Sequence, residues 1–130
     1  MSKASGSVFS MAYLKFYATG STFTYNQAAS SSGGALYAST STLTISSCTF
    51  TSNYASSGGA IYLENACAMT LDSTSFTSNS AASNGGALAV VKSSTSTDDY
   101  NSITISNCAT LTYNSAGSSG GFIYVANAYI

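Results

Sequence analysis

The sequence predicts an all-β protein, a right-handed parallel β-helix with three short strands per turn of about 26 residues and about four to five turns. Three observations favour this fold. A glycine pair recurs along the 130 residues, a Phe-x-x-Asn motif recurs ahead of it, and apolar residues elsewhere alternate with serine and threonine. Alternation of period two is typical of β-strands, and no apolar period of 3.6 residues runs long enough to indicate a helix.

The glycine pairs mark the first expected strand of each turn. Each pair is followed by a short apolar segment such as Ala35-Leu36-Tyr37, and a degenerate fifth copy occupies residues 5–9. Glycine adopts a positive φ without a steric penalty, so the pairs predict a tight corner followed by a strand. The four pairs are Gly33-Gly34, Gly58-Gly59, Gly85-Gly86 and Gly120-Gly121.

Two further strands are expected in each turn. In the best-defined unit, residues 43–45 read Leu-Thr-Ile, and Phe50 lies between two threonines. The same alternation recurs at residues 69–71 and 103–105. Short alternating segments separated by serine, glycine and asparagine indicate strands joined by turns.

The Phe-x-x-Asn motif supplies the columns expected to hold the turns together. Its asparagines are 27, 26 and 35 positions apart. Equivalent residues of a β-helix stack about 4.8 Å apart. The asparagines are therefore expected to form a hydrogen-bonded ladder at a corner, where asparagine tolerates the left-handed conformation. The phenylalanines, with leucine in the fourth unit, are expected in the core. The columns are Asn26, Asn53, Asn79 and Asn114, and Phe23, Phe50, Phe76 and Leu111.

The long last spacing indicates an insertion within a single β-helix segment that covers residues 1–130. Most of the excess lies between Val91 and Ser102, so residues 92–101 are predicted to form a loop that projects from a corner. The chain closes on the first strand of another turn without a polar cap, and solenoids need caps for solubility. We therefore expect either a longer repeat protein or identical copies that stack end to end.

Composition excludes several classes of function. Charged residues make up 5% of the chain, the net charge is −1, and histidine and arginine are absent. Nucleic-acid binding by phosphate neutralisation is therefore excluded, and no apolar run is long enough for membrane insertion. No cofactor, metal or enzymatic activity is expected, because no acid recurs in a column where carboxylates could cluster. The four acids are Glu64, Asp72, Asp98 and Asp99.

Three cysteines are expected to be small corner residues. Cys48 and Cys108 share a column but lie two turns apart, about 9–10 Å, which is too far for a disulfide. Neither they nor Cys67 form a Cys-x-x-Cys pair that would suggest a metal site.

Gly-Gly-Ala-Ile at residues 58–61, recurring with Phe-x-x-Asn, resembles the repeats of the chlamydial polymorphic outer membrane proteins. The resemblance extends over nearly the whole chain, with leucine for isoleucine in two of the tetrapeptides. It implies a right-handed β-helix of the pectin-lyase-like type that forms part of a surface-exposed autotransporter passenger and acts in adhesion. An extracellular or cell-surface location would follow.

Threonines flank the inward residue of the Phe-x-x-Asn strand in every unit, which predicts a Thr-x-Thr array on one flat face. Such arrays bind ice in β-helical antifreeze proteins, although exposed strands also favour threonine for its own sake. The array comprises Thr22, Thr24, Thr49, Thr51, Ser75, Thr77, Thr110 and Thr112.

A second outward column is expected just after the glycine pairs. Its aromatic rings could bind sugars, dock a neighbouring chain or only stabilise the ladder. Its members are Phe9, Tyr37, Tyr62, Ala89 and Tyr124.

The favoured function is an extracellular structural or adhesive β-solenoid segment that assembles with further turns or with copies of itself into a fibre. A surface receptor or glycan would be its other partner. The first alternative is an ice-binding β-helix that uses the Thr-x-Thr array. The second is a non-catalytic remnant or segment of a carbohydrate-active, pectin-lyase-like protein.

Overall fold

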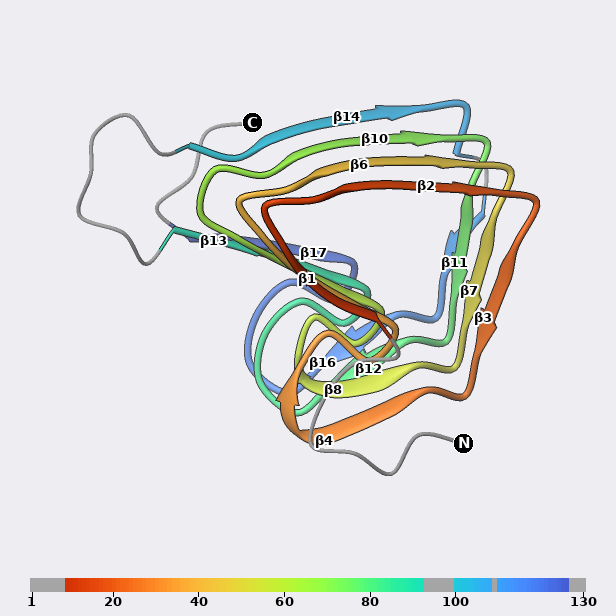
Figure 1. Cartoon of the computed structure of the whole chain (residues 1–130). Helices are drawn as coiled ribbons and strands as arrows, with labels where there is room; N and C mark the ends of the chain where they lie inside the picture. Colours follow the sequence, from red (N-terminus) through yellow and green to blue (C-terminus); the bar gives the residue numbers. More distant parts are fainter. Residues whose placement is uncertain (1–8, 93–99, 109, 127–130) are drawn as a thin grey trace.

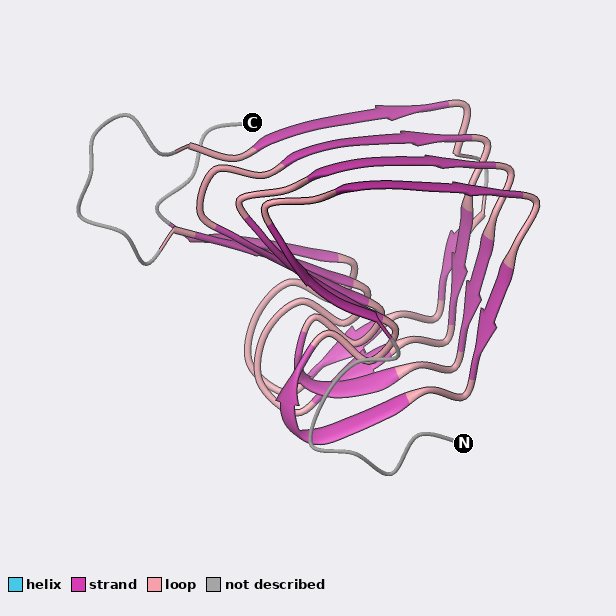
Figure 2. Cartoon of the chain, viewed as in Figure 1, coloured by secondary structure: helices cyan, strands magenta, loops and turns pink. Residues whose placement is uncertain are grey.

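The computed structural model describes residues 9–92, 100–108 and 110–126, and these residues form four parallel β-sheets without a helix. The chain winds as a coil, and each strand pairs with the strand one turn away (Figures 1 and 2). The parallel β-helix predicted from the sequence is therefore confirmed.

The sheets are numbered in the order in which the chain enters them. The first sheet contains β1 (Phe9–Ala12), β5 (Leu36–Ser39), β9 (Ile61–Glu64), β13 (Leu88–Val91) and β17 (Ile123–Ala126). The second contains β2 (Lys15–Thr19), β6 (Thr42–Ser46), β10 (Ala68–Asp72) and β14 (Ser102–Ser106). The third contains β3 (Thr22–Thr24), β7 (Thr49–Thr51), β11 (Ser75–Thr77) and β15 (Leu111–Thr112). The fourth contains β4 (Gln27–Ser32), β8 (Tyr54–Ser57), β12 (Ser80–Ala81) and β16 (Ser115–Ala116).

The fourth sheet corrects the expected three strands per turn, because each turn has four. Its strands follow the asparagine and form the lower side of the coil in Figure 1. The inward residues Ala28, Ala55 and Ala81 are buried, and the remaining positions are mostly serine. Alanine between serines gives almost no apolar alternation, so the sequence pattern did not indicate a strand there.

The core lies inside the coil and is built from stacked columns of identical or similar residues. The rings of Phe23, Phe50 and Phe76 stack with centroids 4.7 and 4.9 Å apart and nearly parallel planes. Phe50 and Phe76 are completely buried, whereas Leu111, the next residue in the column, is 37% exposed in the last turn. Inward leucines and isoleucines of the first and second sheets complete the core.

Three corners of each turn use a residue with positive φ that is usually not glycine. The asparagines of the Phe-x-x-Asn motif were expected to adopt the left-handed conformation themselves. This expectation was wrong, because the residue before each of them adopts it. The asparagine lies just before the next strand with its side chain hydrogen-bonded in the ladder, and the residue before it makes the bend. The left-handed columns are Tyr13, Thr40 and Asn65; Gly20, Ser47, Ser73 and Asn107; and Tyr25, Ser52, Ser78 and Tyr113.

The glycine pairs form the fourth corner, and the two glycines of a pair have different reasons to be there. Gly33 has φ 73°, a conformation that side chains disfavour. Gly34 has an ordinary φ, but a Cβ there would collide with the carbonyl oxygen of Gly59 in the next turn. The stacking of turns, not only the bend, therefore requires the second glycine. The first glycines of the other pairs, Gly58, Gly85 and Gly120, also have positive φ.

The predicted corner loop at residues 92–101 falls largely outside the described residues, because 93–99 are not among them. β13 ends at Val91 and β14 begins at Ser102. Between them, Asn101 is completely buried. Its Oδ1 accepts a hydrogen bond from the main-chain N–H of Cys67, and its Nδ2 donates to the carbonyl of Val91. Asn101 thus connects the end of the insertion to its beginning and to the preceding turn.

Candidate surface-binding site

The asparagine column forms a continuous hydrogen-bonded ladder inside the coil. Asn53 Oδ1 accepts hydrogen bonds from the main-chain N–H and from Nδ2 of Asn26, at 3.0 and 2.9 Å. Asn53 Nδ2 donates to Asn79 Oδ1 and to the carbonyl of Phe23. Asn79 repeats the arrangement toward Asn114. Since Asn53 and Asn79 are completely buried, this half of the repeat motif is structural and cannot contact a ligand.

The cysteines take over the corner hydrogen bonds that serine and threonine make elsewhere. Cys67 Sγ accepts from the main-chain N–H of Ser41 and donates to a carbonyl oxygen. The Cys48 N–H donates to Thr74 Oγ1 of the next turn. All three cysteines, Cys108 included, are free, and burial raises the pKa of the Cys67 thiol. Raised pKa and burial both make Cys67 a poor nucleophile.

The Thr-x-Thr array lies on the outer face of the third sheet. In β3, β7 and β11 the central phenylalanine points inward and the residues on either side of it point outward. Pairing places each outward residue beside its equivalent in the next turn, which gives two parallel columns of hydroxyl groups. The columns are Thr22, Thr49 and Ser75, and Thr24, Thr51, Thr77 and Thr112, while Thr110 precedes β15 and is exposed.

The outward surface of the third sheet is uncharged. All its outward side chains on β3, β7, β11 and β15 are threonine or serine. They are exposed in the first and last turns and half-buried in between. A surface of this kind offers many neutral hydrogen-bonding groups and no electrostatic attraction for a charged partner.

A third threonine column, on the second sheet, was not anticipated from the sequence. Thr44 pairs with Thr70, and Thr70 pairs with Thr104, all on outward positions. In the first turn the same column holds Tyr17. The alternation at residues 43–45, 69–71 and 103–105 predicted these strands, but the threonine at the centre of each was not compared across the turns.

The outward tyrosine column of the first sheet differs by one residue from the expected column. Phe9 pairs with Leu36, so Ser10 and not Phe9 is the equivalent of Tyr37. The degenerate first copy lacks the glycine pair that defines the register, and the alignment was wrong by one position. Tyr37, Tyr62, Ala89 and Tyr124 lie in the column as expected.

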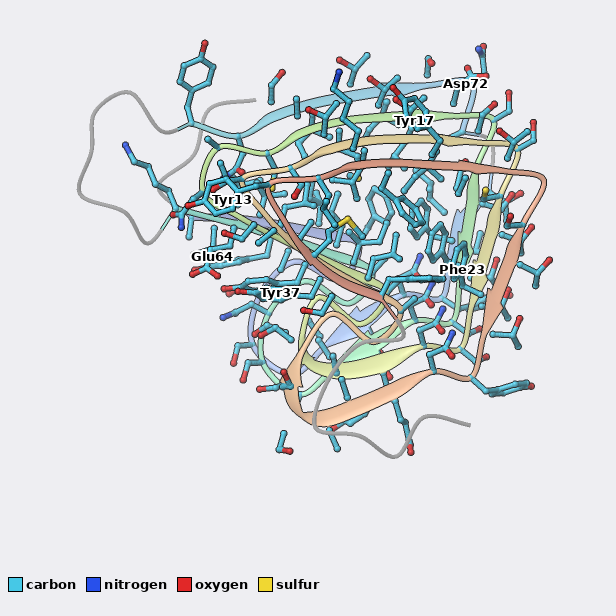
Figure 3. All side chains as sticks on the ribbon, in the orientation of Figure 1. Tyr13, Tyr17, Phe23, Tyr37, Glu64 and Asp72 are labelled. Atoms are coloured by element: carbon cyan, nitrogen blue, oxygen red, sulfur yellow. The ribbon has the colours of Figure 1, made fainter. Side chains whose placement is uncertain are left out.

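Two members of this column contact each other directly, and one of them, Tyr37, lies beside Glu64 (Figure 3). The rings of Tyr37 and Tyr62 stack at 5.5 Å with an interplanar angle of 5°. The Tyr37 hydroxyl donates to Glu64 Oε2. Burial and this carboxylate raise the pKa of Tyr37 well above its usual value, and burial raises that of Tyr62. One face of each tyrosine ring is therefore covered by the other ring, which favours a stabilising role for this pair over ligand binding.

The two described acids of the coil lie on different sheets, Glu64 in β9 and Asp72 in β10. Asp72 accepts hydrogen bonds from Asn107 Nδ2 at 2.7 Å, Ser106 Oγ at 2.9 Å and Ser73 Oγ at 3.1 Å. These hydrogen bonds lower the pKa of Asp72, and the one from Asn107 has the largest effect. Within the described part of the chain no group of histidine, cysteine, aspartate and glutamate residues could hold a metal ion.

Highly exposed tyrosines are the surface feature that the sequence analysis missed. Tyr13, Tyr17, Tyr25 and Tyr113 are 82%, 70%, 66% and 86% exposed. They lie at corners or at the first turn, where the middle turns have serine, threonine or asparagine. The signal in the sequence is a difference within each column: tyrosine stands in the first or last turn where the middle turns have serine, threonine or asparagine.

These features define the chain as a parallel β-solenoid repeat protein whose repeat motifs are internal and whose third sheet has an uncharged outer face. Residues 20–39, 47–64 and 73–90 each match the Chlamydia polymorphic membrane protein repeat. Three segments of the chain thus match this repeat, and the resemblance seen in the sequence is confirmed. Each match includes one Phe-x-x-Asn motif and one glycine pair, whereas the fourth unit, which has Leu111, lies outside the matched segments.

Neither the comparison with curated proteins nor the comparison with solved structures gave a match. The family to which the repeat belongs is associated with the outer membrane or cell surface. Among the described residues there is no helix able to cross a membrane.

Proposed function

We propose that this chain is an extracellular, surface-associated structural and adhesive β-solenoid segment. One observation carries the proposal. Both halves of the repeat motif are buried, so the repeats build a scaffold, and the surface left for partners is a regular array of neutral hydroxyl groups with exposed tyrosines. Columns of identical side chains suit contact with an extended partner better than enclosure of a small substrate.

The adhesive role can be measured with beads that carry the protein. Beads coated with the chain should bind to cultured epithelial cells at least about tenfold more than beads coated with serum albumin, a difference of about 1.4 kcal/mol in apparent affinity. Equal binding of the two kinds of bead would contradict the adhesive role. The structural role would still stand, because electron microscopy and light scattering test it separately.

End-to-end association with further turns or with identical copies is the structural part of the proposal. The asparagine ladder has a direction, since each asparagine donates to the next. A further turn or an identical copy stacked on either side would continue the column of Asn26 and Asn114 in the same direction. Ile105 and Leu111 in the last turn are 40% and 37% exposed. Open strand edges recruit further strands.

Electron microscopy and light scattering test this association. The chain should form filaments or larger assemblies, and Ile105→Lys with Leu111→Lys should prevent them by placing charge on the apolar end. Thr104→Lys is the matched control, because Thr104 lies on the same strand as Ile105 but points outward. Filaments in the double lysine variant, or a monomeric wild-type chain at high concentration, would contradict end-to-end association.

Ice binding is the second candidate, and the register of the third sheet favours it. Two aligned threonine columns on a flat sheet form a lattice with the strand spacing of about 4.8 Å in one direction. Thermal hysteresis at high protein concentration should then be present, and Thr51→Lys with Thr77→Lys should abolish it. Absence of hysteresis in the wild-type chain would dismiss this candidate.

A further inference from the structure

We propose that the third sheet, together with the exposed tyrosines at its corner with the fourth sheet, binds a neutral polysaccharide chain. The inference rests on the proposed adhesive function and names the class of its partner. The surface consists of the outward threonine columns and the corner column of Tyr25, Ser52, Ser78 and Tyr113, and is called the Thr–Tyr face below.

The two tyrosines of this face are in an unusual conformation. Tyr25 and Tyr113 have φ of 55° and 57°, where a bulky side chain is a genuine outlier. The middle turns place the smaller serines Ser52 and Ser78 at the equivalent positions. The tyrosines therefore add no conformational advantage to the corner, and some other property accounts for their presence.

The same tyrosines contribute little to the core. Tyr25 is 66% and Tyr113 is 86% exposed, and neither ring stacks on another aromatic ring among the described residues. Their ring faces are thus open to a ligand, in contrast to the stacked pair Tyr37 and Tyr62. In this column they lie three strand spacings apart, about 14 Å. This span suits an extended ligand that runs along the stacking direction.

The chemistry of the face selects the partner. The negative face of an aromatic ring attracts the weakly positive C–H groups of a sugar ring, and tyrosine adds a hydroxyl at its tip. The adjacent threonine columns offer donors and acceptors at a regular spacing to the hydroxyl groups of the sugars. No outward residue of these strands or of this corner column is charged. A neutral, hydroxyl-rich polymer therefore fits, and an acidic polymer would gain no attraction.

The experiment measures retention of the full chain on insoluble neutral polysaccharides, namely microcrystalline cellulose, chitin and β-1,3-glucan, with heparin beads as the acidic comparison. The wild-type chain should bind at least one of the three neutral polymers and should not bind heparin. Tyr25→Ser with Tyr113→Ser should weaken retention at least about tenfold. Serine already occupies this column in the middle turns, so the variant should keep the fold and the unfolding temperature.

Tyr13→Thr is the matched control. Tyr13 has the same left-handed conformation and similar exposure but lies at another corner, in a column that has Thr40 one turn on. Its substitution should leave retention unchanged. Equal loss in this control, retention on heparin alone, or no retention on any neutral polymer would overturn the assignment. Thermal hysteresis without polysaccharide binding would also overturn it, in favour of ice.

The bead experiment separates this inference from the proposed function. If coated beads bind cells but the chain binds no neutral polysaccharide, the glycan assignment fails and the adhesive function stands. If neither binds, both fail.

Discussion

Asn53 shows how one buried amide connects three successive turns. Its oxygen receives two donors from Asn26, and its nitrogen donates to Phe23 in the same preceding turn and to Asn79 in the following one. Within the described residues no buried side-chain nitrogen or oxygen lacks a partner. The asparagine at this position is therefore fixed by hydrogen-bond geometry on both sides, and a residue of similar size cannot replace it.

Replacement of Asn53 by leucine should lower the free energy of unfolding by about 3 kcal/mol or more. The N–H of Asn26 and the carbonyl of Phe23 lose their side-chain partner in a buried place, at about 1–3 kcal/mol for each unpaired group. Urea denaturation followed by circular dichroism measures the change. Asn26→Leu, at the half-buried end of the ladder, should have a smaller effect, and equal effects would contradict the ladder's role.

Phe50→Ala should cost about 3–5 kcal/mol, because the ring is completely buried and stacks on Phe23 and Phe76. Leu111→Ala, in the same column but 37% exposed, should cost distinctly less. The two unfolding midpoints give the comparison. An unchanged midpoint for Phe50→Ala would place the side chain outside the core.

Acid should weaken the corner that contains Asp72. Its hydrogen bonds lower its folded pKa, so the folded state favours the carboxylate more than the unfolded state does. Ionised Asp72 therefore stabilises the folded state fully above its ordinary pKa of about 3.9. This stabilisation is lost as the pH falls through the lower pKa that Asp72 has in the folded state. Thermal unfolding of wild type and Asp72→Asn below about pH 4 should therefore converge. A constant difference in unfolding temperature down to the lowest pH would contradict this.

At the scale of elements, strands with large inward residues could be predicted from the sequence and strands with small ones could not. Leu43, Ile45 and Phe50 give a clear period of two, and their strands were expected. The fourth strand has only a buried alanine, such as Ala55, between exposed or half-buried serines. Burial of alanine yields little free energy, so the strand is fixed by its neighbours in the stack rather than by its own sequence.

The corners also fall into those that could be predicted from the sequence and those that could not. Positive φ at Gly33 could be predicted, because glycine is the residue that favours it. Positive φ at Ser52 or Tyr25 could not, since these residues have no such preference and the bend is imposed by the strands on either side. The exposed tyrosines of the Thr–Tyr face were missed for this reason: they occupy positions where the local sequence signals neither a turn nor a site.

Asn101 should isolate the coil from whatever sequence the insertion contains. Replacing residues 93–99 by a glycine-serine linker of equal or greater length should change the free energy of unfolding little, because each doubling of loop length costs only about 0.6 kcal/mol. Asn101→Ala should cost about 1–3 kcal/mol, since the Cys67 N–H and the Val91 carbonyl lose their partner. Urea denaturation of both variants tests this. If the linker lowers the free energy of unfolding strongly and Asn101→Ala does not change it, the stabilising role belongs to residues 93–99 and not to Asn101.

At the scale of the whole molecule, each described strand pairs only with the equivalent strands of the turns before and after it. The stability of such a coil is approximately a sum of turn and interface contributions. A turn can be cut out or repeated at equivalent positions, since Ser47 and Ser73 occupy the same left-handed corner position one turn apart.

Duplication of residues 47–72 in place should therefore raise the unfolding midpoint, and deletion of the same residues should lower it. The duplicated segment restores every column in register, including the asparagine ladder and the glycine corner. Thermal unfolding followed by circular dichroism measures the effect. A lower midpoint for the longer chain would show that the turns are not interchangeable.

The asparagine ladder has one more consequence, which concerns the medium around the protein. Amide groups neither gain nor lose protons across the natural range of acidity, and their attraction is not screened by dissolved ions as that between charges is. Cohesion along the coil should therefore be nearly the same in fresh water, in brine and in mildly acidic fluid. A protein that meets changing salt and acidity gains from joining its parts in this way.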